Sequence, residues 1–346
     1  MKGLKLAVAL VIFSFVLGCA SKYMTSGKVY MQLEEYDKAI AQFKEEIKAN
    51  PNNASAYVWL GRAYVATKQF EEACKSFDKA KEISPSRMDK DFKKQPYYYW
   101  AIYFNAGASH MKMKDWEMAR KRLVQASVLE PDTTTTYISL AWVYRNLNQR
   151  DSVIASYKKI IELAPQNINA RVDLARYYMD EQNYRAAIPV LQKIVELDST
   201  NSDAFYLLGV CYSFEAKDTT EDVKNEYYAK ALAYFDKATT IDPQNEDAYF
   251  NWGTLLYKQR RYEEAIEPFK KAVEIVPDDK EAIIFLGAAY LMSKHYKEAV
   301  EAYTRAIELD PNDPELYTNR ASAYWQLGMR DKADADIRRA EELKKE

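Results

Sequence analysis

Histidine, cysteine and glycine are scarce in this sequence of 346 residues. Two histidines and three cysteines are too few for most zinc sites, and they leave little room for catalysis by a histidine base. Nine glycines and eleven prolines are also few for this length, which argues against an all-β chain with many tight turns. Positive charge is not in excess, because 49 lysines and arginines stand against 51 aspartates and glutamates. The composition therefore disfavours both an enzyme and a nucleic-acid-binding protein.

The residues that are abundant are those of a folded protein. Hydrophobic residues make up 48% of the chain and charged residues 29%, a balance that is typical of folded rather than disordered chains. The length is sufficient for two average domains or for one long array of repeats.

The first residues have the pattern of a secretion signal. Lys2 and Lys5 precede an almost wholly apolar run, from Leu6 to Leu17, that contains no acidic residue. As a helix this run spans roughly 18 Å, well short of the roughly 30 Å hydrocarbon core of a bilayer. The run therefore predicts a signal peptide rather than a membrane anchor.

The signal run ends at residues 16–19 in the letters VLGC, which resemble a bacterial lipobox. The resemblance implies that residues 1–18 are a lipoprotein signal peptide, that Cys19 is lipidated, and that the mature chain is 19–346. Several acyl chains on one cysteine anchor a protein stably, whereas a single chain does not. The alternative is that Cys19 is an ordinary buried cysteine.

The residues after the cysteine indicate where such a lipoprotein would be sorted. The next residue is Ala20 rather than aspartate, which in the common sorting rule for bacterial lipoproteins favours the outer membrane. The stretch Ala20–Tyr23 has no acidic residue of the kind that directs some lipoproteins to the cell surface. The resemblance thus implies a lipid anchor on the periplasmic face of the outer membrane.

A repeat with a period of 34 residues extends over the remainder of the chain. Prolines that follow predicted helices mark it, and four of the six intervals between neighbouring prolines are 34 residues long. Such self-similarity predicts a stack of equivalent structural units. The prolines are Pro51, Pro85, Pro131, Pro165, Pro243, Pro277 and Pro311.

Other residue types recur at fixed positions counted along this period. Position 8 is glycine in Gly27, Gly61, Gly107, Gly209, Gly253 and Gly287. Position 11 is tyrosine in Tyr30, Tyr64, Tyr144, Tyr178, Tyr212, Tyr290 and Tyr324. Position 20 is alanine in Ala39, Ala73, Ala119, Ala187, Ala231, Ala265, Ala299 and Ala333, and position 24 is phenylalanine in Phe43, Phe77, Phe235 and Phe269. This pattern resembles the tetratricopeptide repeat, a pair of helices.

The resemblance implies an all-α fold, a right-handed superhelical α-solenoid of about nine helix pairs. Stacking must supply much of the stability, because one helix pair buries too little apolar surface to fold alone. Val153 at an alanine position, His110 at a tyrosine position and Ser199 at a proline position depart from the pattern without obscuring it. The predicted repeats are 20–53, 54–87, 100–133, 134–167, 168–201, 202–245, 246–279, 280–313 and 314–346.

Two insertions interrupt the period. Met88–Tyr99 lies between the second and third repeats, and it combines charged residues with a tyrosine-rich end. Ala216–Asn225, which is mostly polar, lies between the two helices of the sixth repeat. Each insertion is either a longer helix or surface loop, or a contact for a partner, since insertions in repeat arrays map to one edge.

No group of residues has the pattern of an active site. Six of the glycines belong to the repeats, so no glycine-rich phosphate loop remains. His110 and His295 lie in different repeats and lack the neighbour that a metal-binding helix needs. Cys74 and Cys211 are four repeats apart, too far for a disulfide. The sequence predicts no catalytic residue, no metal and no cofactor.

Candidate binding residues lie on the first helix of each repeat. Positions 2, 5, 9 and 12 share one side of that helix, about 80–160° around from position 4. In the tetratricopeptide family this side lines a concave groove that binds peptides or protein segments. The groove would be mostly aromatic and aliphatic here. The candidates are Arg62, Phe104, Trp142, Arg145, Arg176, Tyr206, Phe250 and Tyr257.

Two of these candidates suggest a specific ligand chemistry. Arg145 and Arg176 could hold one carboxylate in bidentate fashion, with the Trp142 ring as an apolar platform. The alternative is that the two arginines pair along the same surface with Asp173, Asp180 or Asp203.

We therefore expect a lipid-anchored, non-catalytic scaffold of the bacterial cell envelope, whose groove binds another envelope protein or a peptide segment. Two alternatives stay open. The groove aromatics Trp142, Tyr206, Phe250 and Tyr257 could bind a glycan, although the long insertions of helical-repeat proteins that bind sugars are absent. If the signal interpretation is wrong, the same scaffold would be a cytoplasmic adaptor. Neither a nucleic acid nor a small-molecule substrate is expected.

Overall fold

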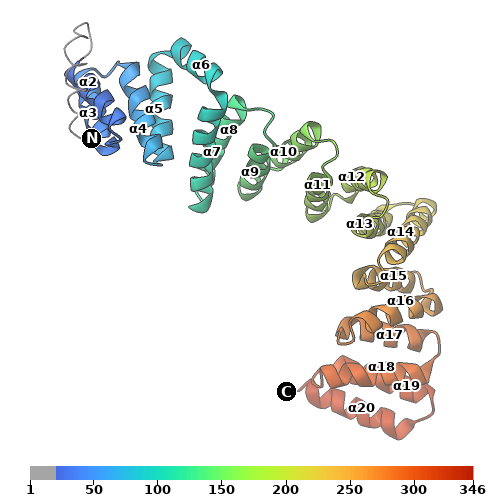
Figure 1. Ribbon diagram of the computed structural model, residues 1–346. Helices are drawn as coiled ribbons and strands as arrows, with labels where there is room; N and C mark the ends of the chain where they lie inside the picture. The colour runs from blue at the N-terminus through green and yellow to red at the C-terminus, as the bar shows by residue number, and fades with distance from the viewer. Residues whose placement is uncertain (1–20, 346) are drawn as a thin grey trace. The chain divides into compact units, whose positions relative to one another are not determined.

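The computed structural model describes residues 21–345, and this part of the chain is helical without a strand. The predicted all-helical solenoid is thereby confirmed, whereas the signal segment 1–18 and Cys19 lie outside the described residues. The chain divides into two compact units, the first ending at Pro165 and the second beginning at Gln166. Within each unit the helices follow one another in chain order as antiparallel pairs (Figure 1).

The first unit consists of helix pairs and one additional helix. The first helices of its pairs are α2 (Lys22–Gln32), α4 (Ala54–Ala66), α7 (Pro96–Lys112) and α9 (Thr134–Asn146). Their second helices are α3 (Tyr36–Ala49), α5 (Phe70–Ile83), α8 (Trp116–Leu129) and α10 (Arg150–Leu163). The additional helix is α6 (Pro85–Lys94), between α5 and α7.

The second unit continues with pairs of the same kind. Its first helices are α11 (Ile168–Asp180), α13 (Ser202–Glu215), α15 (Glu246–Lys258), α17 (Lys280–Met292) and α19 (Pro314–Gln326). The second helices are α12 (Tyr184–Leu197), α14 (Glu221–Ile241), α16 (Tyr262–Ile275), α18 (Tyr296–Leu309) and α20 (Arg330–Leu343). A short 3₁₀ helix, η1 (Ala216–Asp218), precedes α14.

Asparagine or aspartate caps begin most of the first helices. The Asn245 side chain accepts a hydrogen bond from the Ala248 backbone N–H at 2.9 Å, and Asn201 accepts one from Ala204 at the same distance. Each cap satisfies a backbone donor that the first helical turn leaves without a partner. The residues that follow the repeat proline thus set where each new helix starts.

Small residues allow the two helices of a pair to approach closely. A Cβ atom added to Gly253 would lie 2.7 Å from a ring carbon of Phe269, and one added to Gly61 would lie 2.6 Å from Phe77. These distances are shorter than any normal carbon contact, so in these repeats the ring at position 24 occupies the space that a side chain at position 8 would need. The packing explains why glycine and phenylalanine recur together in the sequence.

Both insertions form helix rather than extended loop. Most of Met88–Tyr99 belongs to α6 and to the first turn of α7, which starts at Pro96. The insertion Ala216–Asn225 forms η1 and the start of α14, which has 21 residues where α12 has 14. The longer-helix interpretation therefore describes their conformation.

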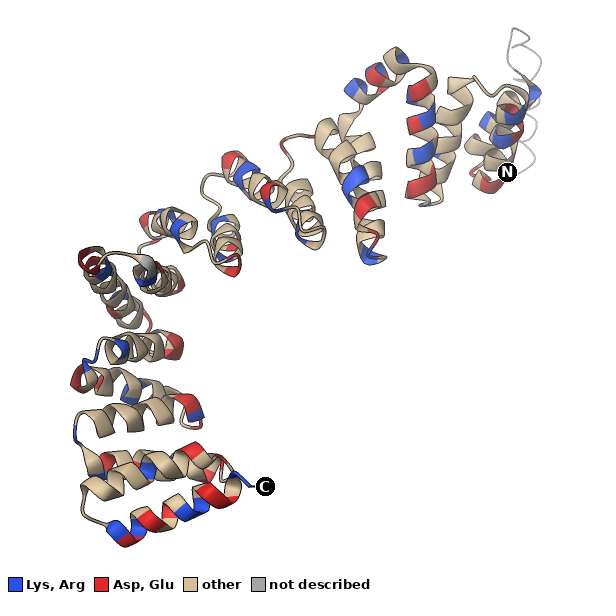
Figure 2. Cartoon of the chain, turned by 180° about the vertical axis from the view of Figure 1, so that it is seen from behind, with Lys and Arg blue, Asp and Glu red and all other residues tan. Residues whose placement is uncertain are grey.

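The last helix, α20, covers the end of the second unit with a polar outer side. Charges of both signs alternate along it (Figure 2). On its inner side Asp336 is buried, and both of its oxygens accept hydrogen bonds from Arg320 of α19, at 2.8 and 2.7 Å. Among residues 21–345, no helix is both long enough and apolar enough for a membrane crossing.

Candidate partner-binding surface

The first-helix face is the surface formed by the side chains at repeat positions 2, 5, 9 and 12 of the first helices and by the aromatic rings that contact them. In the first unit it begins around Trp59 on α4. The guanidinium carbon of Arg62 lies 5.2 Å from the centre of the Trp59 ring, and the ammonium of Lys28 on α2 lies 5.4 Å from it. Two position 9 cations from neighbouring repeats therefore share one aromatic ring, an arrangement that holds both at the surface.

An aromatic ladder runs along α7. The Trp100 ring stacks on Phe104 with centroids 5.2 Å apart and on Tyr97 with centroids 5.0 Å apart. Trp100 Nε1 donates a hydrogen bond of 2.8 Å to Thr136 Oγ1 on α9, which fixes the ladder to the next repeat. Tyr97 is 69% exposed and ends the ladder in solvent. The predicted residue Phe104 is thus one of three stacked rings that form a larger aromatic surface.

Trp142 on α9 lies open to solvent on the same face. Its side chain is 50% exposed, and its ring stands edge-on to Trp116 with centroids 5.4 Å apart. Ile138, one turn earlier on α9, is also exposed. Exposed large apolar side chains at regular helical spacing are typical of a surface that another molecule covers.

In the second unit the structure brings Phe250 and Tyr257 together through a third ring. Both stand edge-on to Phe285 of α17, with centroids 5.6 and 5.9 Å apart. Phe285 in turn stacks on the buried Phe269 at 5.7 Å. The first-helix face is therefore continuous from α15 to α17.

Tyr206 on α13 adjoins this aromatic group. Its hydroxyl accepts a hydrogen bond of 3.4 Å from Asn251 Nδ2 on α15. Burial raises the pKa of Tyr206 to about 12, and the nearby carboxylates of Asp247, Glu246 and Asp203 act in the same direction. The phenol is therefore neutral at physiological pH, and it offers an aromatic ring and a polar hydroxyl rather than a charge.

Carboxylates line the start of each first helix from α13 onward. Glu246 is half-buried, and burial together with Asp279 and Asp247 raises its pKa to about 7. No lysine or arginine stands at positions 2, 5, 9 or 12 of α13, α15, α17 and α19. This part of the face is negative and aromatic, and it suits a partner with cationic and apolar side chains. The position 2 acids are Asp203, Asp247, Glu281 and Glu315.

The two candidate arginines belong to different units. Arg145 is exposed on α9 of the first unit, and Arg176 is exposed on α11 of the second. The prediction that they hold one carboxylate between them stays a prediction, and so does the alternative that they pair with nearby aspartates.

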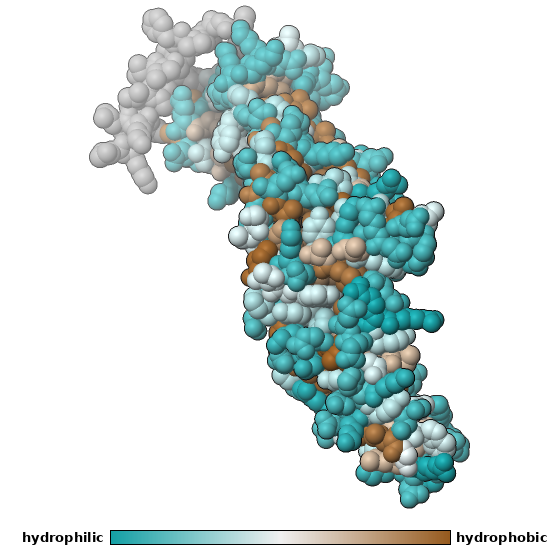
Figure 3. Space-filling view, turned by 90° about the vertical axis from the view of Figure 1, so that its right-hand side faces the viewer, coloured by the Kyte–Doolittle hydropathy of each residue, from teal (hydrophilic) through white to brown (hydrophobic). Residues whose placement is uncertain are grey.

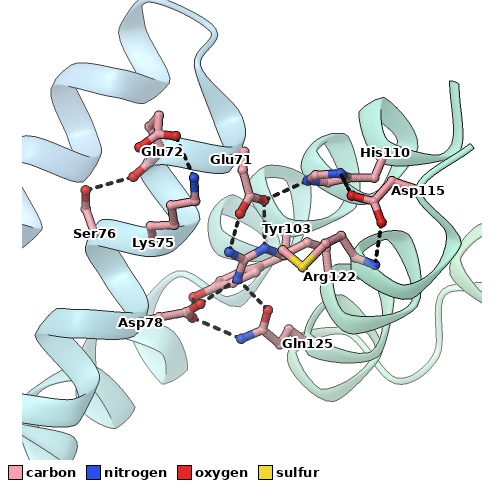
Figure 4. A network of polar contacts seen from close by, with 11 residues as sticks. Glu71, Glu72, Lys75, Ser76, Asp78, Tyr103, His110, Asp115, Arg122 and Gln125 are labelled. Carbon is pink, nitrogen blue, oxygen red and sulfur yellow. Dashed lines mark hydrogen bonds and ion pairs between the residues drawn. The ribbon is translucent and has the colours of Figure 1, made fainter. Parts of the chain in front are cut away.

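A buried polar network links the second and third repeats of the first unit (Figure 4). Arg122 of α8 is 1% exposed and donates two hydrogen bonds to Glu71 of α5, at 2.8 and 2.6 Å. It also donates to Asp78, which accepts a further hydrogen bond of 2.7 Å from the Tyr103 hydroxyl. Arg122 thus forms its hydrogen bonds with side chains of α5 and α8, so the network stabilises the packing of α5, α7 and α8.

His110 lies at the edge of this network. Its Nδ1 is 3.1 Å from Asp115 Oδ2, and its Nε2 is 3.2 Å from Glu71 Oε2. Burial opposes ionisation of Glu71, but hydrogen bonds and charge from Arg122, with a smaller contribution from His110, hold the pKa of that carboxyl below its usual value. His110 therefore occupies a structural position between two carboxylates.

The described residues 21–345 give little support for metal binding or thiol chemistry. In the described part of the chain, no group of three or more histidine, cysteine, aspartate or glutamate side chains could hold a metal ion. Burial raises the pKa of the Cys74 and Cys211 thiols, which makes them poor nucleophiles. Hydrophobic residues on the visible side of the molecule form small patches between hydrophilic ones (Figure 3).

Four aromatic residues of this surface escaped the sequence prediction, namely Trp59, Tyr97, Trp100 and Phe285. Tyr97 escaped because α7 starts at Pro96, earlier than the predicted repeat boundary, whereas Trp100 stands at position 1, outside the four positions considered. Proline is favoured in the first turn of a helix, so Pro96 was the available signal. Trp59 and Phe285 stand at position 6, outside the four positions considered, and reach the face because their rings are large.

Models of one repeat family match most of the described chain. Models described as tetratricopeptide repeat match residues 24–87, 147–211 and 246–279, and a further one matches 223–245 and 314–346. A model described as TPR repeat matches residues 287–328. Together these ranges cover more than half of the chain.

Curated relatives are distant and longer. The chain is 21% identical over 207 residues to the BBSome complex member BBS4 homolog of Drosophila melanogaster, a match that covers 60% of this chain and 39% of that protein. It is 22% identical over 236 residues to DnaJ homolog subfamily C member 7 of Mus musculus, which covers 66% of this chain and 44% of that protein. The chain thus spans less than half the length of either relative.

Solved structures similar to the chain are shorter than it is. The crystal structure of MamA protein is 27% identical, with a TM-score of 0.46, over 54% of this chain and 96% of that one. The structure of YrrB, described as a TPR protein with an unusual peptide-binding site, is 24% identical, with a TM-score of 0.43. That match covers 55% of this chain and 92% of the YrrB chain.

Proposed function

Because the chain belongs to the tetratricopeptide repeat family, we propose that it is a non-catalytic scaffold that binds a segment of a partner protein on its first-helix face. This fold is generally one of interaction scaffolds. The observation that carries the proposal is the row of partly exposed aromatic rings, including Phe104, Trp142 and Tyr257, on successive first helices of each unit. Aromatic residues contribute most to binding when a partner covers them.

The charges beside these rings indicate what the partner segment contains. In the first unit the ring of Trp59 is flanked by Lys28 and Arg62, which favours carboxylates on the partner. In the second unit the position 2 acids such as Asp247 favour lysine or arginine on the partner. A segment that carries apolar anchors with charges beside them is therefore the ligand class that this face suits.

The location of the scaffold forms a separate part of the proposal. The lipobox-like residues 16–19 support a lipid anchor on Cys19 at the periplasmic face of the outer membrane. A Cys19→Ala variant should fold normally and leave the membrane fraction after a salt wash. If the variant stays with the membrane, the hypothesis of a lipid anchor on Cys19 is wrong. If the unaltered chain is found in the cytoplasm, the protein is an adaptor of that compartment.

Binding on the first-helix face is tested by removing two of its rings together. Cells that produce the wild-type chain, a Phe250→Ala/Tyr257→Ala variant or a Val276→Ala control are treated with crosslinker, and the captured proteins are compared. Val276 is exposed in a turn after α16, so the control removes apolar surface from another place. We expect capture of one partner to fall about tenfold in the double variant alone. Equal capture by all three would contradict the proposal.

A further inference from the structure

The additional helix α6 is firmly held, although the repeat pattern does not account for it. Its Met88 is fully buried and its Phe92 nearly so. The Phe92 ring stands edge-on to Tyr99 and Tyr103 of α7, with centroids 4.6 and 6.3 Å apart. At the other side of the helix, Arg87 donates a hydrogen bond to Ser55 Oγ on α4. α6 is therefore a fixed part of the first unit, with a defined outer surface.

A groove lies between α6 and the second helix α8. It consists of two adjoining hollows of about 430 and 220 Å³, which share Lys81, Phe92, Val128 and Leu129. Val124 of α8 lines the smaller hollow, and Lys93 of α6 lines the larger one. Val128 is 76% exposed and Val124 is 38% exposed, one helical turn apart on the same side of α8. The floor is apolar and open to solvent.

The two valines are unusual for their repeat positions. Val128 stands at position 29 and Val124 at position 25 of the third repeat. Position 29 of the other repeats carries Lys48, Glu82, Glu162, Glu196, Thr240, Glu274, Glu308 and Glu342. Position 25 carries Lys44, Asp78, Lys158, Gln192, Asp236, Lys270, Thr304 and Arg338. Positions 25 and 29 are thus polar in every repeat except the third, where both are valine and where α6 forms the other wall of a groove.

Positive charge surrounds this apolar floor. Within the groove Lys81 pairs with Asp89 at 3.1 Å, and Asp78 pairs with Arg122, which Glu71 shares, and accepts a hydrogen bond from the Tyr103 hydroxyl. Lys93 on α6 and Lys121 on α8, the latter one turn before Val124, form no ion pair with any described residue. The rim is therefore cationic in a chain whose net charge is −2.

We propose that the groove between α6 and α8 binds an acidic amphipathic helix of a partner protein. Two helical walls with an apolar floor suit a third helix, whose apolar side chains one turn apart occupy the groove. Carboxylates on the flanks of that helix lie beside Lys93 and Lys121, where opposite charge fixes the orientation. This site is separate from the first-helix face and does not depend on it.

The test uses a phage-displayed library of random 14-residue peptides, selected on the purified protein. The selected peptides are then synthesised, and their affinity is measured by fluorescence anisotropy for four proteins. Val128→Glu gives the third repeat the residue that most other repeats carry at this exposed position, so the variant should fold. Lys93→Glu reverses one charge of the rim. Val223→Glu is the matched control, an exposed valine of α14 in the second unit.

We expect a class of acidic peptides with apolar residues at i and i+4. The affinity of this class should fall at least about tenfold with Val128→Glu and about threefold with Lys93→Glu, and should not change with Val223→Glu. The proposal is overturned if no selected peptide responds to Val128→Glu, or if the responding peptides are not acidic. Peptides that respond to Phe250→Ala/Tyr257→Ala instead belong to the first-helix face, so the two sites are tested independently.

Discussion

At the scale of single residues, the guanidinium of Arg122 shows how charge is buried between repeats. Its carboxylate partners Glu71 and Asp78 lie on another helix pair and are distant in sequence. Desolvation of the three charges costs free energy, which the short charge-assisted hydrogen bonds offset only while every partner is present. Removal of one charged side chain should therefore lower the stability by more than the intact ion pair contributes to it.

Arg122→Met should lower the free energy of unfolding around α8 by about 3 kcal/mol at neutral pH, the lower end of the range for a broken buried pair, because the two carboxylates that lose their partner are only half-buried. The pKa of Glu71 is lowered in the folded chain, so its contribution is present above the ordinary carboxyl pKa and is lost as the pH falls below it. The difference between wild type and variant should thus shrink in acid. Hydrogen exchange of the α8 amides measures it, and a difference that does not depend on pH would contradict this account.

Glu246 should behave in the opposite way. Burial and two neighbouring aspartates raise its pKa to about 7, so the folded chain binds an extra proton between about pH 4.5 and 7. Its ionisation therefore lowers stability as the pH rises through this range. Glu246→Gln should stabilise α15 by about 1 kcal/mol near pH 8, a value reduced for partial exposure to solvent, and by much less near pH 5. Urea unfolding at the two pH values is the measurement.

At the scale of elements, one residue in a left-handed conformation ends most of the first helices. Position 15 has φ between 55° and 74° in Glu34, Lys68, Lys114, Asn148, Gln182, Arg260, Lys294 and Gly328. The following backbone N–H bonds back to the helix, as His295 does to the Tyr290 carbonyl at 2.8 Å. Only Gly328 adopts this conformation without steric cost. The sixth repeat lacks this turn, because η1 follows α13 there.

This turn gives a paired prediction. Lys294→Gly should raise the free energy of unfolding by about 0.5 kcal/mol, since the relief of strain exceeds the loss of chain entropy. Gly328→Ala should lower it by about 1 kcal/mol through the backbone alone, because no atom lies within 4 Å of the added Cβ. Chemical denaturation of the two variants measures both changes in the free energy of unfolding. The same sign for both would show that the turn is not strained.

The period predicted the helix pairs well, because glycine and alanine positions are fixed by close packing that any such pair requires. It did not predict α6 as a separate helix, although Pro85 and Pro96 at two helix starts and the apolar pair Met88 and Phe92 were visible signals. The Arg122 network was not predictable, because its partners are 44 to 51 residues away and only stacking brings them together.

At the scale of the whole molecule, the repeat period passes through Pro165 unchanged, yet the chain divides there into two compact units. Each unit carries its own aromatic part of the first-helix face, with cations beside it in the first unit and carboxylates in the second unit from α13 onward. The predicted residues Phe250 and Tyr257 lie together because a first helix repeats the same face at each turn. Phe285 and Trp100, which join such residues into a surface, depend on ring size and helix length that the period does not specify.

The central claim is that a partner protein lies on the first-helix face. A photoreactive amino acid placed at Trp142 or Tyr257 probes that face in cells, and one placed at Lys159 or Lys271 on second helices serves as the control. The account predicts that the first two positions form an adduct with one and the same protein and that the second two do not. Adducts of that protein at the control positions, with none at Trp142 and Tyr257, would contradict it.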